Sequence, residues 1–346
     1  MYDFIFITHQ PAFYKVNLYN ELAKQKKVFV VFISDGSSIR NKDFINCNMK
    51  FEHVFLNNGP FEKRNWFFSC LRLLKQLKKI SAKKIVVGGW ELPEFWLSVI
   101  CNKKFKNAVI IESSIYESEV NSVFGMMKSF FLKMISLAYC SGKPHAELLK
   151  ELGYSRRMLI TGGVGLKNRI GEPSSLHIKK TIPSTGVNFL YVGRLSQEKG
   201  LLFLIEFFRR RCDLKLTIVG DGPLKKILLK ECPENVTLLG YVSNSELRDV
   251  YQSHDIFILP SHSEPWGLVV EEALHFGLPV VCSSKVGCNI DLVHDPDTGV
   301  IFDDGNFESL LLATKQVIND YPHYLEKIKL FNSKNKDKHQ INAYIE

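Results

Sequence analysis

Short, apolar, β-branched runs alternate with helical periodicity along almost the whole 346-residue chain, in two successive blocks. Repeated β-α units of this kind form parallel sheets that are covered by helices on both faces. The chain is also longer than one hydrophobic core usually supports, so two domains are expected. We therefore predict an α/β protein with two doubly wound, Rossmann-like domains that face one another across a cleft.

The apolar runs predict seven strands in the first block and five in the second. They lie at 3–8, 28–34, 51–56, 84–88, 108–112, 137–141 and 158–161, and then at 187–193, 215–220, 236–240, 255–260 and 279–283. A stretch rich in Gly, Pro and Ser separates the blocks and is typical of a linker. The expected domains are 1–166 and 187–325, with a linker at 167–186 and a polar, helical tail at 326–346.

The net charge of +9 is spread unevenly. Residues 1–185 carry 28 Lys and Arg against 14 Asp and Glu, whereas residues 186–346 carry 17 against 22. A basic first half indicates an anionic partner, which leaves nucleic acid, an acidic membrane and a phosphorylated substrate open. A solvated, lysine-rich surface is the simpler alternative. We expect no nucleic-acid partner, because the basic regions contain no recognisable reader motif.

Composition excludes several other classes of protein. Apolar residues make up 45% and charged residues 23%, as in globular domains. No apolar stretch reaches the roughly 18 uncharged residues that a membrane span needs, and the N-terminus is predicted to be a strand rather than a signal peptide. The eight cysteines form no Cys-x-x-Cys pair, which favours reduced core cysteines in the cytoplasm over zinc or disulfides.

One segment places two cations between a predicted strand and helix. Gly193-Arg194-Leu195-Ser196-Gln197-Glu198-Lys199-Gly200 follows the strand at 187–193, and we expect Lys199 in the first turn of the next helix. A lysine there opposes the helix dipole unless an anion lies between the two. The segment therefore predicts that Arg194 and Lys199 bind a diphosphate, although an ordinary solvated loop would also fit.

A second segment, residues 260–274, carries two carboxylates eight residues apart. Glu264 is expected in a strand-to-helix loop, where it can accept hydrogen bonds from sugar hydroxyls. Glu272 is expected on the apolar side of the helix, where a buried carboxylate needs partners such as ribose hydroxyls. We expect the neighbouring Glu271 to face solvent.

These segments resemble glycosyltransferase family 4, a group of retaining enzymes with the GT-B fold. The resemblance rests on Gly-Arg-Leu with Lys-Gly, then Val219-Gly220-Asp221-Gly222-Pro223, Leu239-Gly240-Tyr241-Val242, and Glu264 with Glu272. It covers residues 187 to about 303 in order and spacing, and it is weak over 1–165, where the family binds the acceptor. It leaves open whether the tail returns to the first domain.

The resemblance implies a role for each matching residue. Arg194 and Lys199 correspond to the diphosphate-binding pair, Glu264 to the carboxylate that contacts the donor sugar, and Glu272 to the one that holds the ribose. The remaining donor-binding positions are Gly193, Tyr241, Val242, Trp266, Gly267 and Leu268. It also implies front-face transfer with retention, in which the leaving phosphate accepts the proton of the acceptor hydroxyl.

The sequence further predicts that the reaction needs no metal or other cofactor. Stabilisation of the leaving diphosphate then falls to cationic side chains and a helix N-terminus. We expect no Asp-x-Asp motif, which is used by metal-dependent glycosyltransferases whose fold differs from GT-B.

In the first domain, His9 and Tyr14 lie in the segment after the first strand, and the resemblance implies that this segment shapes the acceptor site. Glu112 ends a strand where many relatives place a histidine, so contact with the sugar and a plain surface position are both open. Lysine and aromatic residues interleave at 64–79 and 126–133. One face of each stretch could rest on an acidic bilayer, or both could be ordinary amphipathic helices.

The combined expectation is a cytoplasmic glycosyltransferase, peripheral on the inner face of the membrane. It would transfer a hexose-type sugar from a nucleotide-diphosphate donor to a glycan acceptor, such as a lipid-linked or lipopolysaccharide precursor. A nucleotide-sugar epimerase or phosphorylase of the same fold, a glycosidase with paired carboxylates, and a non-catalytic nucleotide-sugar-binding protein remain alternatives.

Overall fold

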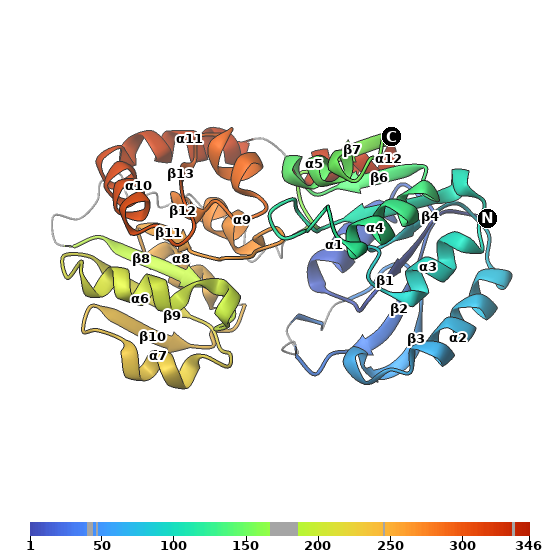
Figure 1. The fold of residues 1–346 in the computed structure, drawn as a ribbon, viewed down its shortest axis with the longest axis horizontal. Coiled ribbons are helices and arrows are strands. Elements are labelled where there is room, and N and C mark those ends of the chain that lie inside the picture. The colour runs from blue at the N-terminus through green and yellow to red at the C-terminus, as the bar shows by residue number, and fades with distance from the viewer. Residues whose placement is uncertain (40–43, 46–47, 167–185, 245, 334–335) are drawn as a thin grey trace. The chain divides into compact units, whose positions relative to one another are not determined.

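The computed structural model describes residues 1–39, 44–45, 48–166, 186–244, 246–333 and 336–346. The chain divides into two compact units, which Figure 1 shows as two separate sheets with their helices. The first unit contains Met1–Asn168 and also Lys336–Glu346, and the second contains Arg169–Asn335. All but the last residue of the expected linker lies outside the described residues.

The first unit is built on a sheet of seven strands, and every neighbouring pair is parallel. The strands are β1 (Tyr2–Thr8), β2 (Val28–Gly36), β3 (Glu52–Pro60), β4 (Ala82–Val87), β5 (Asn107–Ile111), β6 (Leu137–Cys140) and β7 (Arg157–Ile160). Their spatial order is β3-β2-β1-β4-β5-β6-β7. The chain therefore starts near the middle of the sheet and builds first one side and then the other, which is the predicted doubly wound topology.

Helices cover both faces of this sheet because its strands are apolar on both sides. The helices are α1 (Phe13–Leu22), α2 (Trp66–Lys79), α3 (Pro93–Ile100), α4 (Val123–Lys133), α5 (Lys143–Glu151) and α12 (Lys336–Ile345). Ile5 and Ile7 of β1 belong to a core with side chains from α2, α3, α4 and α5. Phe4 and Phe6 point to the other face, where the core includes side chains of α1 and Tyr344 of α12. This alternation is the period-2 pattern of a strand buried on both faces.

The C-terminal helix α12 is thus part of the first unit, although the second unit precedes it in the chain. Its Tyr344 is 2% exposed. The ring stacks on Tyr139 of β6 with a centroid distance of 4.3 Å and meets Phe6 of β1 edge-on at 6.0 Å. The tail therefore completes the hydrophobic core on the α1 face.

The second unit has six parallel strands in the order β10-β9-β8-β11-β12-β13. They are β8 (Asn188–Val192), β9 (Lys215–Val219), β10 (Val236–Gly240), β11 (Ile256–Leu259), β12 (Val280–Ser283) and β13 (Gly299–Phe302). The helices are α6 (Leu201–Arg209), α7 (Lys225–Glu231), α8 (Leu247–Ser253), α9 (Leu268–His275), α10 (Phe307–Asn319) and α11 (Tyr321–Ser333). The two Rossmann-like sheets confirm the predicted fold class.

The sequence predicted twelve of the thirteen described strands, and it missed β13. That strand has only four residues and begins with Gly299, and glycine is depleted in strands. The helix that was expected to contain Lys199 in its first turn begins later, because α6 starts at Leu201 after a separate 3-10 turn, Gln197–Lys199.

Each sheet has one point at which the order of the strands reverses direction. In the first unit this switch point lies between β1 and β4, and in the second it lies between β8 and β11. Loops that leave the carboxyl ends of two such strands diverge and leave a crevice between them, where open α/β sheets bind their ligands. The switch point of the second unit lies between the two sequence segments that contain Lys199 and Glu264.

The substitution Tyr344→Ala tests the role of α12. It removes a buried aromatic ring from the core of the first unit, so we expect the free energy of unfolding of that unit to fall by about 3–5 kcal/mol. Thermal or urea unfolding of the full chain measures the effect. Asn342→Ala, at an exposed position of the same helix, is the control and should change little. Equal stability of the two variants would contradict this packing.

Candidate functional site

The loop after β8 carries the two predicted cations. The chain leaves the sheet at Val192, and Leu195 Nα donates a 3.0 Å hydrogen bond to the carbonyl oxygen of Asp221 in the loop after β9. Arg194 is exposed on this loop. Lys199 ends the 3-10 turn, so the expectation that it lies in the first turn of α6 is wrong. The cation stands just before the helix because Gly200, in a left-handed conformation, separates the two elements.

Gly200 also lets the loops after β8 and β11 approach one another. Its φ is +66°, and a Cβ atom built on it would lie 2.1 Å from the carbonyl oxygen of Pro260. In the same contact, His262 Nα donates a 2.9 Å hydrogen bond to the carbonyl oxygen of Glu198. Only glycine combines this φ with so close a backbone contact. The two loops at the switch point are therefore held together by their backbones.

At this junction Lys199 and Glu264 form an ion pair. Lys199 Nζ donates to Glu264 Oε2 at 2.7 Å, and the two side chains are only 15% and 16% exposed. The pairing offsets the cost of removing each charge from water. The structure thus brings together two residues that the sequence predicted separately, 65 positions apart.

The backbone around Glu264 fixes the position of its carboxylate. Glu264 forms an isolated parallel bridge with Val286, and Gly287 Nα donates a 2.8 Å hydrogen bond to the carbonyl oxygen of Glu264. The segment after β12 therefore contacts the backbone of the loop after β11 and holds it in place. A carboxylate held in this way is preorganised, which is what a specific hydrogen-bond acceptor for a ligand requires.

Tyr191 lies beneath the two loops and was missed by the sequence analysis. Its side chain is fully buried, and its hydroxyl donates a 3.0 Å hydrogen bond to the carbonyl oxygen of Arg194. Burial, and then the negative charges of Glu264 and Glu198, raise the pKa of Tyr191 well above its usual range. The hydroxyl stays protonated and continues to support the loop that carries Arg194.

Glu272 lies on α9 and has a protein partner. Tyr251 of α8 is fully buried, and its hydroxyl donates a 3.0 Å hydrogen bond to Glu272 Oε2. Burial and the nearby Glu272 carboxylate raise the pKa of Tyr251 well above its usual range. The sequence suggested ribose hydroxyls as partners for this carboxylate, whereas the structure satisfies one of its oxygens with a tyrosine.

The expectation that Glu271 faces solvent is wrong. Its Oε1 accepts a hydrogen bond from the indole nitrogen of Trp266 at 2.5 Å, and Glu271 is half-buried. Trp266 itself is 3% exposed. Because this indole nitrogen is buried, it needs an acceptor, and Glu271 provides it. The pair anchors the turn that leads into α9.

The predicted donor-binding residues Gly267 and Leu268 form the start of α9. Gly267 has φ +103°, the helix begins at Leu268, and no described side chain caps this N-terminus. The first amides of a helix carry partial positive charge and lack partners within the helix, so they attract anions. The start of α9 follows Glu264 by four residues.

The other predicted donor-binding residues lie on the same edge of the sheet. Gly193 immediately follows β8, and Tyr241 and Val242 follow β10. Gly220, which follows β9, donates a 2.8 Å backbone hydrogen bond to the carbonyl oxygen of Gly240. Tyr241 is 46% exposed. An exposed aromatic ring at this edge is available for stacking on a planar ligand group.

In the first unit, His9 lies across the switch point from Glu91. The loops after β1 and β4 carry the two residues, and His9 Nε2 is 2.9 Å from Glu91 Oε1. Burial alone would raise the pKa of Glu91, but the hydrogen bond and charge of His9 lower it. The sequence analysis missed Glu91, although it comes directly after Gly88-Gly89-Trp90 at the end of a predicted strand.

Glu112 pairs with a buried lysine that the sequence analysis also missed. Lys15 Nζ is 2.8 Å from Glu112 Oε1, and the lysine side chain is 7% exposed. Burial alone would lower the pKa of Lys15, but the Glu112 carboxylate outweighs it and raises the pKa above its ordinary value. The signal in the sequence was that this lysine lies on the apolar side of α1. The preceding residue, Tyr14, is held by its backbone, because its carbonyl oxygen accepts a 2.9 Å hydrogen bond from Leu166 Nα.

The expectation that the chain contains no Asp-x-Asp triplet is wrong, because Asp295-Pro296-Asp297 has this spacing. The triplet precedes β13, so it lies at the amino edge of the sheet, opposite to the edge that carries Lys199 and Glu264. Asp297 Oδ2 is 2.7 Å from His323 Nε2 and 3.3 Å from Lys327 Nζ. These contacts give it a structural role. Among the described residues, no group of three or more His, Cys, Asp or Glu could hold a metal ion.

Comparisons with known proteins agree with this architecture. Two solved structures align with 99% of the chain at 15% identity, which shows the fold. The lipopolysaccharide outer core galactosyltransferase WaaB has a TM-score of 0.71, with 99% of that chain covered. Anabaena Alr3699/HepE, solved in complex with UDP, has a TM-score of 0.70, with 98% of that chain covered. The fold is therefore that of the GT-B class.

The second unit also matches a known sequence family. Residues 174–334 match the model of the family "Glycosyl transferases group 1". An uncharacterized glycosyltransferase, MJ1607, from Methanocaldococcus jannaschii is 33% identical over 140 residues, which are 38% of this chain and 36% of that protein. The chain covers between 25% and 39% of the lengths of the first four curated relatives.

Gly200→Ala tests the contact between the two loops. We expect the second unit to lose about 1–2 kcal/mol from the left-handed φ alone and about 1–3 kcal/mol more from the clash with Pro260. Gly305→Ala is a matched control, because Gly305 has φ +70° and nothing within 4 Å of the added Cβ. Thermal unfolding compares the two variants. Equal destabilisation would show that the backbone approach at Pro260 is unimportant.

Proposed function

We propose that this protein is a retaining glycosyltransferase that moves a sugar from a nucleotide-diphosphate donor to a glycan acceptor. The observation that carries the proposal is the ion pair between Lys199 and Glu264 at the switch point of the unit that matches group 1 glycosyl transferases. The pair places a cation and a carboxylate at one junction, where a donor's phosphate and hydroxyl groups need these two kinds of partner. The UDP bound in the HepE structure supports a nucleotide donor.

The proposed reaction breaks the bond between the anomeric carbon and the diphosphate oxygen. The acceptor oxygen forms the new bond to the anomeric carbon on the same face, and its proton passes to the leaving phosphate. The transfer involves no oxidation or reduction, and no metal or other cofactor is required in this scheme. Negative charge grows on the diphosphate as it leaves, so the transition state needs nearby positive charge.

In this scheme Lys199, Arg194 and the N-terminus of α9 supply that positive charge. Lys199 is held by Glu264 before the donor arrives, so little reorganisation is needed when the diphosphate binds. The Glu264 carboxylate then accepts hydrogen bonds from the sugar hydroxyls. Glu272 contacts the ribose hydroxyls, and Tyr241 and Val242 contact the nucleobase.

We propose that the acceptor is a lipid-linked glycan or a lipopolysaccharide precursor, used on the cytoplasmic side of the membrane. The basic first unit supports an anionic acceptor, and His9, Tyr14 and Glu112 belong to the edge of its sheet where ligands bind in such folds. The likeness in fold to a lipopolysaccharide galactosyltransferase is consistent with such an acceptor.

A nucleotide-sugar epimerase or phosphorylase would share this fold and donor site. An epimerase would consume the donor without any acceptor, and a phosphorylase would need inorganic phosphate. A glycosidase would need two carboxylates flanking one bond, whereas Glu264 is paired with Lys199 and Glu272 with Tyr251. Incubation with donor alone, with donor and phosphate, and with donor and glycolipid separates these activities.

Lys199→Ala and Arg194→Ala test the proposed diphosphate contacts. Loss of either cation should lower turnover about 10²–10³-fold, as removal of a single preorganised donor does elsewhere. Thermal-shift measurements with UDP, GDP, ADP and CDP first identify the nucleotide that binds, and release of that nucleotide from its sugar then reports turnover. Lys215→Ala is the control, because Lys215 is exposed at the amino end of β9. Full activity in either test variant would overturn the assignment.

A further inference from the structure

Exposed apolar side chains gather on one part of the first unit. Of the 21 large apolar side chains that are exposed in the described chain, eleven lie between residues 66 and 130. We call these eleven the apolar face: Trp66, Phe67, Phe68, Leu71, Ile100, Phe105, Val123, Phe124, Met126, Met127 and Phe130. They come from α2, the end of α3 and the turn that follows it, and α4. Monomeric soluble proteins rarely expose apolar patches of this extent without a partner.

Six of the eleven side chains of the apolar face line a groove of about 1090 Å³. Side chains of α2, α3 and α4 line it, among them Trp66, Leu71, Trp96, Phe124 and Met127. Trp96, which lines the groove, stacks on the exposed Phe130 with a centroid distance of 6.3 Å, and this contact joins α3 to α4. The three helices cover the same face of the sheet (Figure 1). The patch is therefore continuous across three elements.

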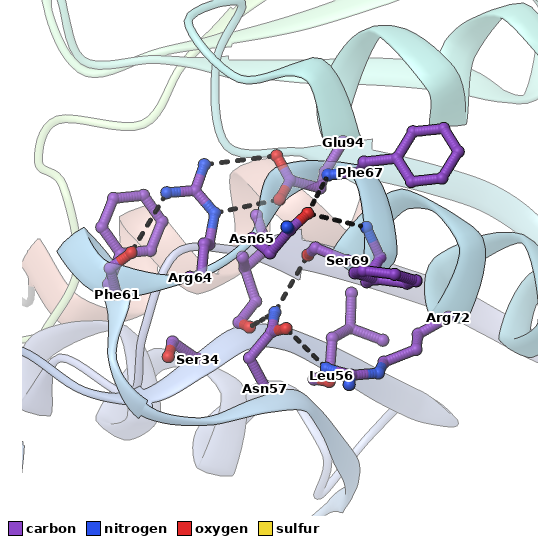
Figure 2. A network of polar contacts seen from close by, with 12 residues as sticks. Ser34, Leu56, Asn57, Phe61, Arg64, Asn65, Phe67, Ser69, Arg72 and Glu94 are labelled. Atoms are coloured by element: carbon purple, nitrogen blue, oxygen red, sulfur yellow. Dashed lines mark hydrogen bonds and ion pairs between the residues drawn. The ribbon is translucent and has the colours of Figure 1, made fainter.

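The inward side of α2 shows why its aromatic residues remain outside. The buried residue Ser69 accepts a 2.9 Å hydrogen bond from Asn57 Nδ2, and Arg72 donates a 2.7 Å hydrogen bond to Asn57 Oδ1 (Figure 2). Leu73 is the other buried residue of this helix. Rotation of α2 to bury its aromatic stripe would leave these polar groups unpaired, which is costly inside a protein.

A second set of contacts fixes the start of the helix. Asn65 caps α2 by accepting hydrogen bonds from the amides of Phe67 and Phe68. Arg64 reaches α3, where its Nε lies 3.0 Å from Oε1 of the completely buried Glu94 (Figure 2). A buried ion pair is expensive to break. The exposed aromatic residues are thus held at the surface by the structure beneath them.

The segment that contains the apolar face is strongly positive, although Glu91, Glu117 and Glu119 line the groove together with Lys128. Residues 61–133 contain 13 Lys and Arg against 6 Asp and Glu, a net charge of +7. Three of the acidic residues, Glu91, Glu94 and Glu112, are already paired with His9, Arg64 and Lys15. The exposed lysines in this region are Lys63, Lys75, Lys78, Lys79, Lys83, Lys103, Lys104 and Lys133, of which Lys83 pairs with Asp3. The partner that fits this surface combines an apolar interior with negative charge.

We infer that the apolar face docks on a bilayer that contains anionic phospholipids. Its aromatic and methionine side chains would enter the acyl-chain boundary, while the surrounding lysines contact the headgroups. A second copy of the chain is a poorer occupant, because it would bring two regions of charge +7 together. None of the described helices is long and apolar enough to cross a bilayer. The inference deepens the proposed function by naming the surface that would hold the enzyme beside a lipid-linked acceptor.

Co-sedimentation of the full chain with vesicles tests this inference. We expect binding to vesicles of mixed phosphatidylglycerol and phosphatidylcholine, with at least tenfold weaker binding to phosphatidylcholine alone. Phe67→Ser combined with Phe124→Ser should weaken binding at least tenfold. Leu312→Ser combined with Leu330→Ser is the control, because these residues of the second unit are 60% and 63% exposed. This control should bind as the unchanged protein does.

A variant with fewer positive charges tests the electrostatic part of membrane binding independently. Lys103→Gln combined with Lys104→Gln removes two exposed charges beside Phe105, and each is worth about fivefold in affinity for an anionic surface (about 1 kcal/mol). Equal sedimentation with both kinds of vesicle would overturn the inference. So would a dimer in light scattering that the Phe67 and Phe124 changes dissociate. Lys199→Ala should bind vesicles normally, so a failure of membrane docking is distinguishable from a failure of the proposed transfer reaction.

Discussion

The contact between the loops after β8 and β11 is the constraint on which the candidate site depends. Gly200 brings one loop against the backbone of Pro260, and the ion pair between Lys199 and Glu264 spans the same junction. The parallel sheet determines which loops meet there, because β8 and β11 are paired neighbours at the switch point and their carboxyl ends lie side by side. Sheet order, a left-handed glycine and a charge pair thus act together to place the site.

Ion pairs recur at the carboxyl edges of both sheets. His9 and Glu91 face one another across the switch point of the first unit, and Lys15 and Glu112 lie on the same edge. Each pair keeps charged groups compensated at a position where full burial would be costly. Polar groups held in this way are well suited to exchange one partner for a ligand. Both units therefore carry preorganised charge at the edge where such sheets bind small molecules.

The sequence was sufficient for the architecture because its signals were local and repeated. Twelve strands were predicted from their apolar runs, whereas β13, a four-residue strand that begins with a glycine, was not. The site residues were found through motifs, but their partners were not. Tyr251 and Glu272 are 21 positions apart, and Lys199 and Glu264 are 65 apart. Nothing local in a sequence indicates such distant pairing, so Lys15 and Glu91 were overlooked. Glu271 and Tyr191 have partners only five and three positions away, and they were misjudged or missed because the burial of Trp266 and Tyr191 depends on the tertiary packing.

A crystal structure of the protein with the bound nucleoside diphosphate tests the central claim most directly. Our account predicts that the phosphates lie between Lys199 and the first amides of α9, with the ribose at Glu272. A diphosphate bound elsewhere, while the junction of Lys199 and Glu264 stays unchanged and unoccupied, would contradict it.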